Sequence, residues 1–430
     1  MTALAAASLE SPPTRGLRRL LPSGDASWAQ HLERHGPLPQ FAGRRASLIA
    51  EVERSGLAGR GGAGFPTAVK LQAVAAGRAP IVVANGTEGE PASAKDRILM
   101  THNPHLVLDG ALVALTAVGG DEAVLAVSRR ARPAHAALTR ALAERRADAR
   151  RIRLVAVPDR FVAGEETALV SWLNGGEAKP TFTPPRPFER GVGGRPTLVQ
   201  NVETLANLGL IARYGAGWFR ETGTEAEPGT VLVTVRGGVR RPGVIEVELG
   251  TPLRQVVDRC GGLAAPVRAL LVGGYFGTWI DAAGNLDLPL ADAALRPHRA
   301  ALGARTLVVL PHGVCGVAET ARVARYLAGE SAGQCGPCVF GLPAVAQALE
   351  SIAAGAPDAA PLAGASATAE RADRRPRCLP PSRRRAALRR QRDPRVRGRD
   401  RAPPRRPLPC RPRRAAPAHE SRELGLEVRR

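Results

Sequence analysis

Gly59-Arg-Gly-Gly-Ala-Gly-Phe-Pro-Thr-Ala-Val-Lys70 is a glycine-rich segment in which Pro66 suits the first position of a helix. The segment satisfies the spacing G-x-G-x-x-G, but a helical pattern rather than a strand precedes it. Ala84 stands about 20 residues on, where a dinucleotide-binding fold has an acid, so the segment is not a Rossmann fingerprint. Its bare backbone N–H groups, Arg60, Lys70 and the start of a helix predict a phosphate-binding loop instead. A flexible glycine hinge is the structural alternative.

Short apolar runs follow this loop and alternate with helical patterns. Residues 81–84, 123–127 and 152–157 are typical of buried strands, and residues 134–146 are typical of a helix. This alternation predicts an α/β core. The polar segment 85–96 directly follows the first strand, at the carboxyl end where α/β proteins bind ligands.

A second polar segment, Gly164-Glu-Glu-Thr-Ala168, opens a predicted helix. Acidic residues at a helix start usually do no more than compensate the helix dipole, so this segment is a weak signal by itself.

The pattern changes after residue 228. Residues 229–275 predict a compact β-β-α-β module, and after Val314 two helical stretches flank Cys335-Gly-Pro-Cys338. We therefore expect a small helical bundle with a cysteine loop. A C-x-x-C pair of this kind indicates metal or redox chemistry more than a structural disulfide, although a full metal site needs further ligands. Cys260 and Cys315 fall inside predicted elements and are interpreted as core residues.

The net charge of +22 over 430 residues is concentrated at one end of the chain. Residues 371–430 hold 22 arginines, ten prolines and six acidic residues, whereas residues 1–370 hold 39 basic and 33 acidic residues. A nucleic-acid-binding arm, a solvated extension and a shifted reading frame are three explanations for this Arg/Pro-rich tail. We favour the shifted frame. Because no aromatic residue is interleaved for base stacking, no nucleic-acid partner is expected.

No uninterrupted apolar stretch reaches the ~20 residues that a membrane-spanning helix needs. The first residues also lack the basic region that precedes the apolar run of a secretory signal. We expect a cytoplasmic chain without direct membrane insertion.

Several segments, in the same order, resemble the flavin subunit (the F subunit) of bacterial NADH-quinone oxidoreductase, respiratory complex I. Similar subunits occur in NAD-reducing hydrogenases and formate dehydrogenases. The resemblance covers roughly residues 45–345, and its matching pieces are residues 55–70, 85–97, 161–173, 194–207, 239–272 and 330–338.

The resemblance implies an α/β fold with an FMN-binding core, then a β-grasp (soluble-ligand-binding) module and a C-terminal helical bundle with a 4Fe-4S cluster. The expected division is a partly disordered leader (1–44), an FMN/NADH-binding domain (45–228), a β-grasp domain (229–300), a helical iron-sulfur-binding domain (301–370) and the Arg/Pro-rich disordered tail (371–430). The implied activity is that of an NADH dehydrogenase, in which electrons pass from NADH through FMN to the cluster and on to a quinone or a protein acceptor.

By motif matching, the resemblance also implies site residues. The residues expected around FMN are Gly59, Arg60, Gly61, Gly62, Lys70, Asn85, Glu88, Gly164, Glu165, Glu166 and Asn201. Phe65, Glu90 and Glu166 would face the nicotinamide nucleotide. The chemistry belongs to the flavin, so no catalytic side-chain acid or base is expected.

Three departures from the family pattern affect the flavin and nucleotide sites. Thr87 stands where an Asp is usual, and Ala73 and Arg186 stand where aromatic residues are usual. Each lost aromatic contact removes ~1 kcal/mol of nucleotide binding, so FMN binding is better supported than NADH binding. Two alternatives remain open: a subunit that exchanges electrons with a ferredoxin, and a non-catalytic β-grasp binding protein with a vestigial flavin site.

The cluster motif departs from the family as well, because Ala332 replaces the first cysteine of the family's Cys-x-x-Cys-x-x-Cys. Cys335, Cys338 and, about forty residues on, Cys378 are the expected metal ligands, against four thiolates in such clusters. We predict a labile cluster and a poorly soluble C-terminal domain. The expected partners are NADH and a small iron-sulfur protein or a complex I-type subunit, which would hold the chain on the inner face of the membrane.

Overall fold

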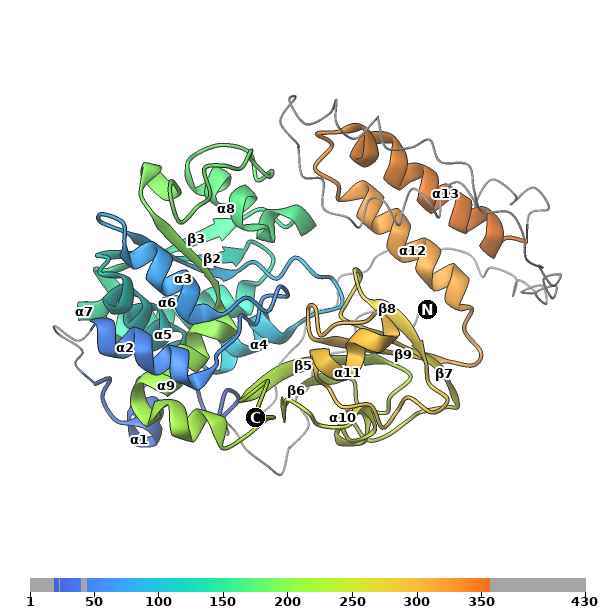
Figure 1. The fold of residues 1–430 in the computed structure, drawn as a ribbon, viewed down its shortest axis with the longest axis horizontal. Helices are drawn as coiled ribbons and strands as arrows, with labels where there is room; N and C mark the ends of the chain where they lie inside the picture. The colour runs from blue at the N-terminus through green and yellow to red at the C-terminus, as the bar shows by residue number, and fades with distance from the viewer. Residues whose placement is uncertain (1–18, 23, 40–44, 356–430) are drawn as a thin grey trace, which may run out of the picture.

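The computed structural model describes residues 19–22, 24–39 and 45–355. Figure 1 shows three parts: an α/β core, a second sheet with short helices beside it, and a pair of helices at one corner. No helix among these residues is both long enough and apolar enough to cross a membrane.

The α/β core is built on four parallel strands in the order β3-β2-β1-β4. The strands are β1 (Ile81–Gly86), β2 (Glu122–Ser128), β3 (Ile152–Val157) and β4 (Thr197–Asn201). Both faces of the sheet are covered: Val82 and Ala84 pack into one apolar cluster and Val83 into another. Burial on both faces explains why these strands are continuous apolar runs, as in other parallel sheets. The predicted α/β core is therefore confirmed, with β4 as a strand that the sequence analysis did not predict.

Helices cover this sheet. They are α1 (Trp28–His35), α2 (Arg45–Ser55), α3 (Thr67–Ala75), α4 (Lys95–His102), α5 (Pro104–Val118), α6 (Arg132–Glu144), α7 (Arg146–Ala149), α8 (Glu166–Leu173) and α9 (Val202–Arg220), with short 3₁₀ turns at Phe161–Gly164 and Val192–Gly194. Helices α5 and α9 cross closely at Gly110, where a Cβ atom would lie 1.9 Å from the carbonyl oxygen of Leu205. This contact permits only glycine and fixes α9, which begins at the end of β4.

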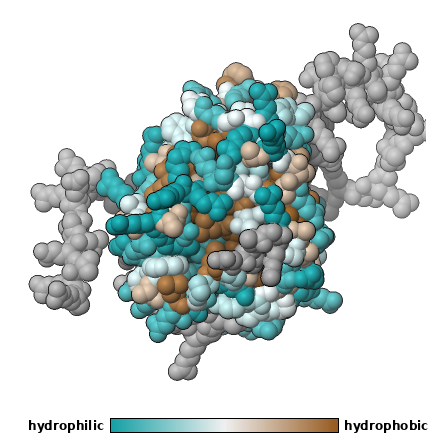
Figure 2. Space-filling model, turned by 90° about the vertical axis from the view of Figure 1, so that its left-hand side faces the viewer, coloured by the Kyte–Doolittle hydropathy of each residue, from teal (hydrophilic) through white to brown (hydrophobic). Residues whose placement is uncertain are grey.

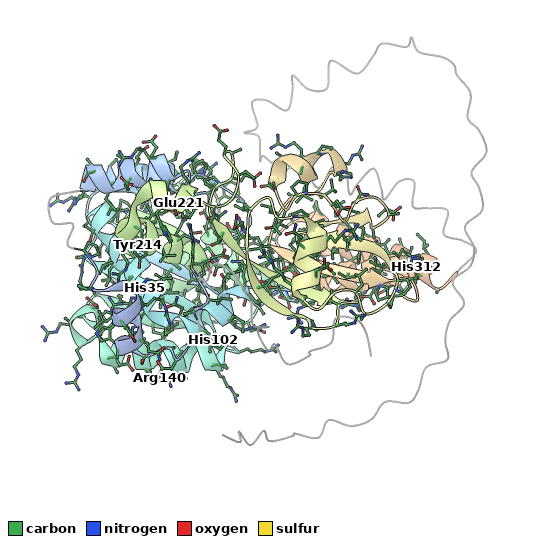
Figure 3. The ribbon with its side chains drawn as sticks, turned by 90° about the horizontal axis from the view of Figure 1, so that it is seen from below. His35, His102, Arg140, Tyr214, Glu221 and His312 are labelled. Atoms are coloured by element: carbon green, nitrogen blue, oxygen red, sulfur yellow. The ribbon has the colours of Figure 1, made fainter. Side chains whose placement is uncertain are left out.

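The described part of the leader packs on the core. The guanidinium of Arg19 lies 3.8 Å from the ring centre of Trp218, and the side chain of Leu20 is fully buried. At the end of α1, His35 Nδ1 lies 2.8 Å from the hydroxyl of Tyr214, and Figure 3 shows the two side by side. Figure 2 shows the side of the molecule that lies at the left of Figure 1. Hydrophobic residues lie in the middle of this face and hydrophilic residues surround them.

The second sheet has five strands in the order β6-β5-β9-β7-β8. They are β5 (Thr230–Gly237), β6 (Gly243–Glu248), β7 (Val267–Val272), β8 (Thr278–Asp281) and β9 (Thr306–Pro311), and only the pair of β5 and β9 is parallel. Helix α10 (Leu253–Arg259) packs on one face, and α11 (Asp292–Leu295) and a 3₁₀ turn (Arg296–His298) precede β9. The predicted β-β-α-β order is present. The boundary expected at residue 300 cuts this sheet, because β9 lies at its centre.

The last described part is a hairpin of α12 (Gly316–Gly329) and α13 (Leu342–Ala353), joined by a loop and a π-helical turn (Pro337–Gly341). Arg325 of α12 and Glu350 of α13 form an ion pair with N–O distances of 2.5 and 2.8 Å. Val339 and Phe340 of the π-helical turn are 45% and 75% exposed, and Ile352 of α13 is 37% exposed, so both segments present apolar side chains to solvent.

Candidate functional site

The glycine loop, residues 59–64, lies between α2 and α3 and is closed by two backbone hydrogen bonds. Gly59 N donates to Phe65 O and Thr67 N donates to Leu57 O, both at 2.9 Å. Gly62 and Gly64 have φ values of +121° and +62°, a region that side chains disfavour. Pro66, the N-cap residue of α3, makes no side-chain hydrogen bond to the first turn, and the first N–H group of the helix, that of Thr67, is the one that donates to Leu57.

Gly61 brings the loop against the end of β4. A Cβ atom at Gly61 would lie 3.1 Å from Cβ of Asn201, closer than nearly all such contacts in proteins. Because glycine has no Cβ atom, the loop backbone can approach Asn201 this closely.

Two buried arginines lie beneath the loop. The Arg60 guanidinium donates to the carbonyl of Pro228 at 3.1 Å, and that of Arg305 donates to the carbonyl of Gly59 at 3.0 Å. Burial, reinforced by the neighbouring Arg305, lowers the pKa of Arg60 to about 9. The Nε atoms of both side chains are buried without a hydrogen-bond partner among the described residues. The positive charge predicted for this loop is thus present, but the Arg60 side chain points under the loop toward the second sheet. Arg305 is a second arginine at this loop, and no local pattern in the sequence indicated it.

Asn85 and Asn201 are direct partners at the carboxyl ends of β1 and β4. The Asn201 amide donates to the carbonyl of Asn85 at 3.4 Å, and the Asn85 amide donates to the carbonyl of Gly164 at 2.9 Å. The structure thus brings together three residues that lie far apart in the sequence and that the resemblance assigns to one site.

Thr87, the replacement for the family's usual Asp, holds the Asn85 side chain. Its backbone N–H and its hydroxyl both donate to Oδ1 of Asn85, at 3.2 and 2.7 Å. A Cβ atom at Gly164 would lie 2.8 Å from the Thr87 hydroxyl, so glycine is needed there too. With Thr87 in place of the usual Asp, the side chain of Asn85 is still held in one orientation by hydrogen bonds.

Lys70 and Glu166 form an ion pair beside these strand ends. Lys70 Nζ lies 3.3 Å from Glu166 Oε2 and donates to the carbonyl of Val199 at 3.4 Å. The two side chains are 32% and 37% exposed, so both remain accessible to a ligand.

The carboxylates of Glu88 and Glu165 have a different role, because each accepts hydrogen bonds from a helix N-terminus. Glu88 accepts from the backbone N–H groups of Asp96 and Arg97 at 2.9 and 3.1 Å. Glu165 accepts from those of Thr167 and Ala168, both at 2.9 Å. The structure therefore places these two predicted site residues as caps of α4 and α8, which position the loops next to Asn85 and Gly164.

A buried charged cluster lies directly behind Asn201. Lys95 Nζ lies 2.7 Å from Asp96 Oδ1 and 2.9 Å from Glu203 Oε2, and Asn201 donates to Asp96 Oδ2 at 2.8 Å. Burial raises the pKa of Asp96 to about 6, against the opposing effect of Lys95. Burial alone would lower the pKa of Lys95, but Asp96 and Glu203 outweigh it and raise this pKa. No pattern in the sequence indicated this cluster, although Lys95 and Asp96 lie at the end of the polar segment 85–96.

Phe65 and Glu90, both expected to face the nucleotide, differ in whether their side chains are available to a ligand. Phe65 is 46% exposed at the end of the glycine loop. Glu90 instead accepts from the backbone N–H groups of Ala92 and Tyr275, at 3.1 and 2.9 Å, and burial raises its pKa. Glu90 thereby ties the core to the second sheet.

A group of aromatic side chains, which the sequence analysis missed, lies where the three parts meet. Phe161 of the core packs against Phe276 of the second sheet's loop, with ring centres 5.3 Å apart. Tyr326 of α12 packs edge-on against Tyr275 at 5.5 Å. These contacts join the hairpin to the other two parts.

The cysteine loop carries the two thiols of the C-x-x-C motif. Sγ of Cys335 lies 3.3 Å from Sγ of Cys338, and burial raises the pKa of Cys338, as does the hydrogen bond from Cys335. No group of three or more metal-ligating side chains is arranged around a common point within the described residues. The expected third ligand, Cys378, lies outside them. Cys260 is buried, as predicted, and burial raises its pKa to about 12.

The two predicted cofactor sites thus differ in how well their residues fit. The glycine loop, crowded against Asn201 at Gly61 and with the buried positive charges of Arg60 and Arg305 beneath it, fits the phosphate of FMN. The two described thiols are half of the four ligands that a 4Fe-4S cluster takes, so the described residues do not fit that cluster.

Family models match three regions of the chain. Residues 52–209 match the Nuo51 FMN-binding domain, residues 232–274 match the SLBB domain, and residues 318–382 match the NADH-ubiquinone oxidoreductase-F iron-sulfur binding region.

Individual proteins match over most of the chain. The second F subunit of NADH-quinone oxidoreductase in Rhizobium meliloti (strain 1021) is 33% identical over 325 residues, which are 72% of this chain and 77% of that protein. The F subunit of the Streptomyces coelicolor enzyme is 34% identical, and the match covers 72% of each chain. The crystal structure of an NAD⁺-reducing [NiFe]-hydrogenase in the H₂-reduced state superposes with a TM-score of 0.67 at 33% identity. That match covers 77% of this chain and 57% of the hydrogenase chain.

Proposed function

This chain belongs to the family of flavoproteins that form the F subunit of NADH-quinone oxidoreductase, and we propose that its glycine loop and the ends of β1 and β4 hold FMN. The predicted class, an FMN-dependent NADH dehydrogenase flavoprotein with an iron-sulfur binding region, is confirmed at the level of the family. FMN supplies the step from two-electron hydride transfer to single-electron transfer. The protein's own residues bind and orient the reactants.

The observation that carries the proposal is the register of Asn85 and Asn201. These residues end adjacent parallel strands as direct partners, and the glycine loop presses on Asn201 at Gly61. Carboxyl ends of parallel strands are the usual ligand sites of α/β proteins. We propose that the phosphate lies on the N–H groups of Gly61 and Gly62, while that of Gly59 closes the loop on Phe65.

Lys70 and Glu166 are the charged side chains that we assign to direct ligand contact. Both are about one-third exposed, whereas Glu88 and Glu165 are engaged by helix ends. In this proposal Lys70 binds an anionic or carbonyl oxygen of the flavin, and Glu166 orients Lys70 and accepts from a hydroxyl group of the nucleotide.

NADH binding would rest on Phe65, with its half-exposed ring at the end of the glycine loop. With Ala73 and Arg186 in place of two aromatic residues, one stacking face remains. Arg186 is exposed, and in this proposal its guanidinium pairs with a nucleotide phosphate.

The test is an anaerobic visible absorption spectrum of the purified full chain reconstituted with FMN, before and after NADH is added. We expect flavin absorption that is bleached by NADH. Lys70→Met should weaken FMN retention, while Lys179→Met, in an exposed pair with Glu177, is the matched control and should behave as the parent. A chain that retains no FMN contradicts the proposal. Bleaching by reduced ferredoxin but not by NADH would support the ferredoxin alternative instead.

The family also implies complex I-type partner subunits. We propose that a small iron-sulfur protein takes the electrons and that such subunits hold the chain at the inner face of the membrane. Reduction of an added ferredoxin-type protein by NADH, dependent on bound FMN, tests the acceptor. Absence of this transfer while NADH still bleaches the flavin would exclude that class of acceptor.

A further inference from the structure

The spacing of Cys335 and Cys338 in the cysteine loop suits two thiols that react with each other. One turn of helix brings them together, since Val339 N donates to Cys335 O at 3.0 Å, and their sulfur atoms lie 3.3 Å apart. An S–S bond of about 2.05 Å can form from this position by rotation of the two side chains.

The loop is held in place by contacts that a bond between these sulfurs leaves intact. Gln334 donates to the carbonyl of Pro180 at 3.0 Å, and the backbone N–H of Phe161 donates to Glu330 at 2.8 Å. Both anchors precede Cys335 and involve neither sulfur atom, so the bond can close without breaking them.

The pair is also asymmetric in a way that suits exchange with another disulfide. Cys335 is exposed, whereas Cys338 is partly covered and follows it by one helical turn. An exposed thiol that an incoming disulfide can reach and a shielded second thiol beside it are the two parts that such exchange needs.

We infer that Cys335 and Cys338 form a dithiol–disulfide couple that exchanges with small disulfides of the glutathione type, in place of ligating a four-iron cluster. This role goes beyond the flavin chemistry and does not depend on it. Ala332 stands at the first cysteine position of the family motif, and no third ligand is present among the described residues.

The exchange is balanced in two steps. The sulfur of Cys335 attacks one sulfur of the small disulfide, which gives a mixed disulfide, and the first small thiol leaves with the Cys335 proton. The sulfur of Cys338 then attacks that of Cys335, and the second small thiol leaves with the Cys338 proton. The pair is oxidised by two electrons and the small disulfide is reduced by two.

The test uses the full chain, equilibrated without oxygen in glutathione buffers of rising oxidised fraction, then alkylated, digested and weighed by mass spectrometry. We expect the peptide with both cysteines to lose two hydrogen atoms and to resist alkylation in oxidised buffer, and to be alkylated twice in reduced buffer. Cys338→Ser should stop the exchange at the mixed disulfide of Cys335 with glutathione. Cys335→Ser should react with glutathione disulfide about tenfold more slowly, because only the partly covered thiol is left.

Cys315→Ser is the matched control, because it removes a half-buried thiol from the start of α12 and should leave the exchange unchanged. Two results overturn the inference. One is a pair that is alkylated twice at every glutathione ratio. The other is a chain that binds iron and acid-labile sulfide in about the four-to-four ratio of a cluster and loses both in Cys335→Ser. Bleaching of the flavin by NADH is measured on the same samples, so that a failed flavin site is not mistaken for a failed thiol pair.

Discussion

The glycine loop and the cysteine loop are both cofactor motifs in this sequence, but they are supported very differently. Behind the glycine loop lie two strand ends, two buried arginines and a buried cluster of Lys95, Asp96 and Glu203. The cysteine loop has two thiols and a few anchoring hydrogen bonds. The difference teaches that a short motif shows where a cofactor belongs in a family, whereas the side chains brought in from other elements show whether the site is complete.

The buried cluster behind the glycine loop provides the largest expected effect. Lys95→Met would leave the carboxylates of Asp96 and Glu203 buried without their cation, at a cost of about 3–5 kcal/mol in the free energy of unfolding. Urea unfolding followed by circular dichroism measures this cost. The control is Lys179→Met, at an exposed pair, which should change stability by less than about 1 kcal/mol. A Lys95 variant as stable as the control would show that the cluster does not support the site.

Gly61→Val should come next. Its side chain would meet Asn201 and crowd the glycine loop, so the affinity for FMN should fall about 100-fold or more, which corresponds to about 3 kcal/mol. Fluorescence titration with FMN measures this loss. Gly217→Ala, in α9 with open space around it, is the control and should leave the affinity unchanged. Full FMN affinity in the Gly61 variant would place the flavin elsewhere.

Asp96 gives the site a pH dependence. Because its pKa is raised from 3.8 to about 6 in the folded chain, the folded chain keeps a proton that the unfolded chain loses in that range. The contribution of Asp96 to the free energy of unfolding therefore falls as pH rises from 3.8 to about 6 and is constant above it. Urea unfolding of the parent and of Asp96→Asn at several pH values should show a stability difference that varies within this window. A difference that is the same at every pH would contradict the raised pKa.

Phe65→Ala tests the remaining aromatic contact at the nucleotide side. Loss of one stacking ring should raise the KM for NADH about fivefold, as expected for about 1 kcal/mol, and leave FMN content unchanged. Val69→Ala is the control, since Val69 is equally exposed, at 46%, and lies within α3. Steady-state kinetics with an artificial electron acceptor measure the KM for NADH of both variants. An unchanged KM would remove Phe65 from the nucleotide site.

The smallest effect on the flavin is expected from a change in the cysteine loop. Ala332→Cys adds the thiol that the family motif has at this position, so iron and acid-labile sulfide bound after anaerobic reconstitution should rise above the parent's level. The FMN content should not change. Ala332→Ser, which adds a polar group without a thiol, should bind no more iron than the parent. Equal iron in the cysteine and serine variants would show that thiol number does not limit this loop.

Most of the core could be predicted from the sequence because its strands are long apolar runs with a polar segment directly behind the first of them. Strand β4 was missed because it is short and ends in the polar pair Gln200 and Asn201, and only pairing with β1 makes it a strand. Strand β9 was assigned to the helical domain because it precedes α12 in the chain. Its place at the centre of the second sheet is set by pairing across long sequence distances, which a local pattern does not contain.

The same limit applies to the site. Asn85, Asn201 and Gly164 were predicted by motif and do meet, whereas the roles of Glu88 and Glu165 as helix caps depend on where α4 and α8 begin. Arg305 was missed because no local pattern connects it with the glycine loop, which it contacts from the start of β9.

The hydrogen bond from Arg305 to Gly59 joins residues 246 positions apart. During synthesis, the glycine loop emerges early but gains this support only after nearly all of the second sheet has been translated. Until then β5 also lacks its parallel neighbour β9. A reading-frame error before Thr306 would therefore damage the first cofactor loop at a distance, whereas one beyond residue 355 spares every contact described for it.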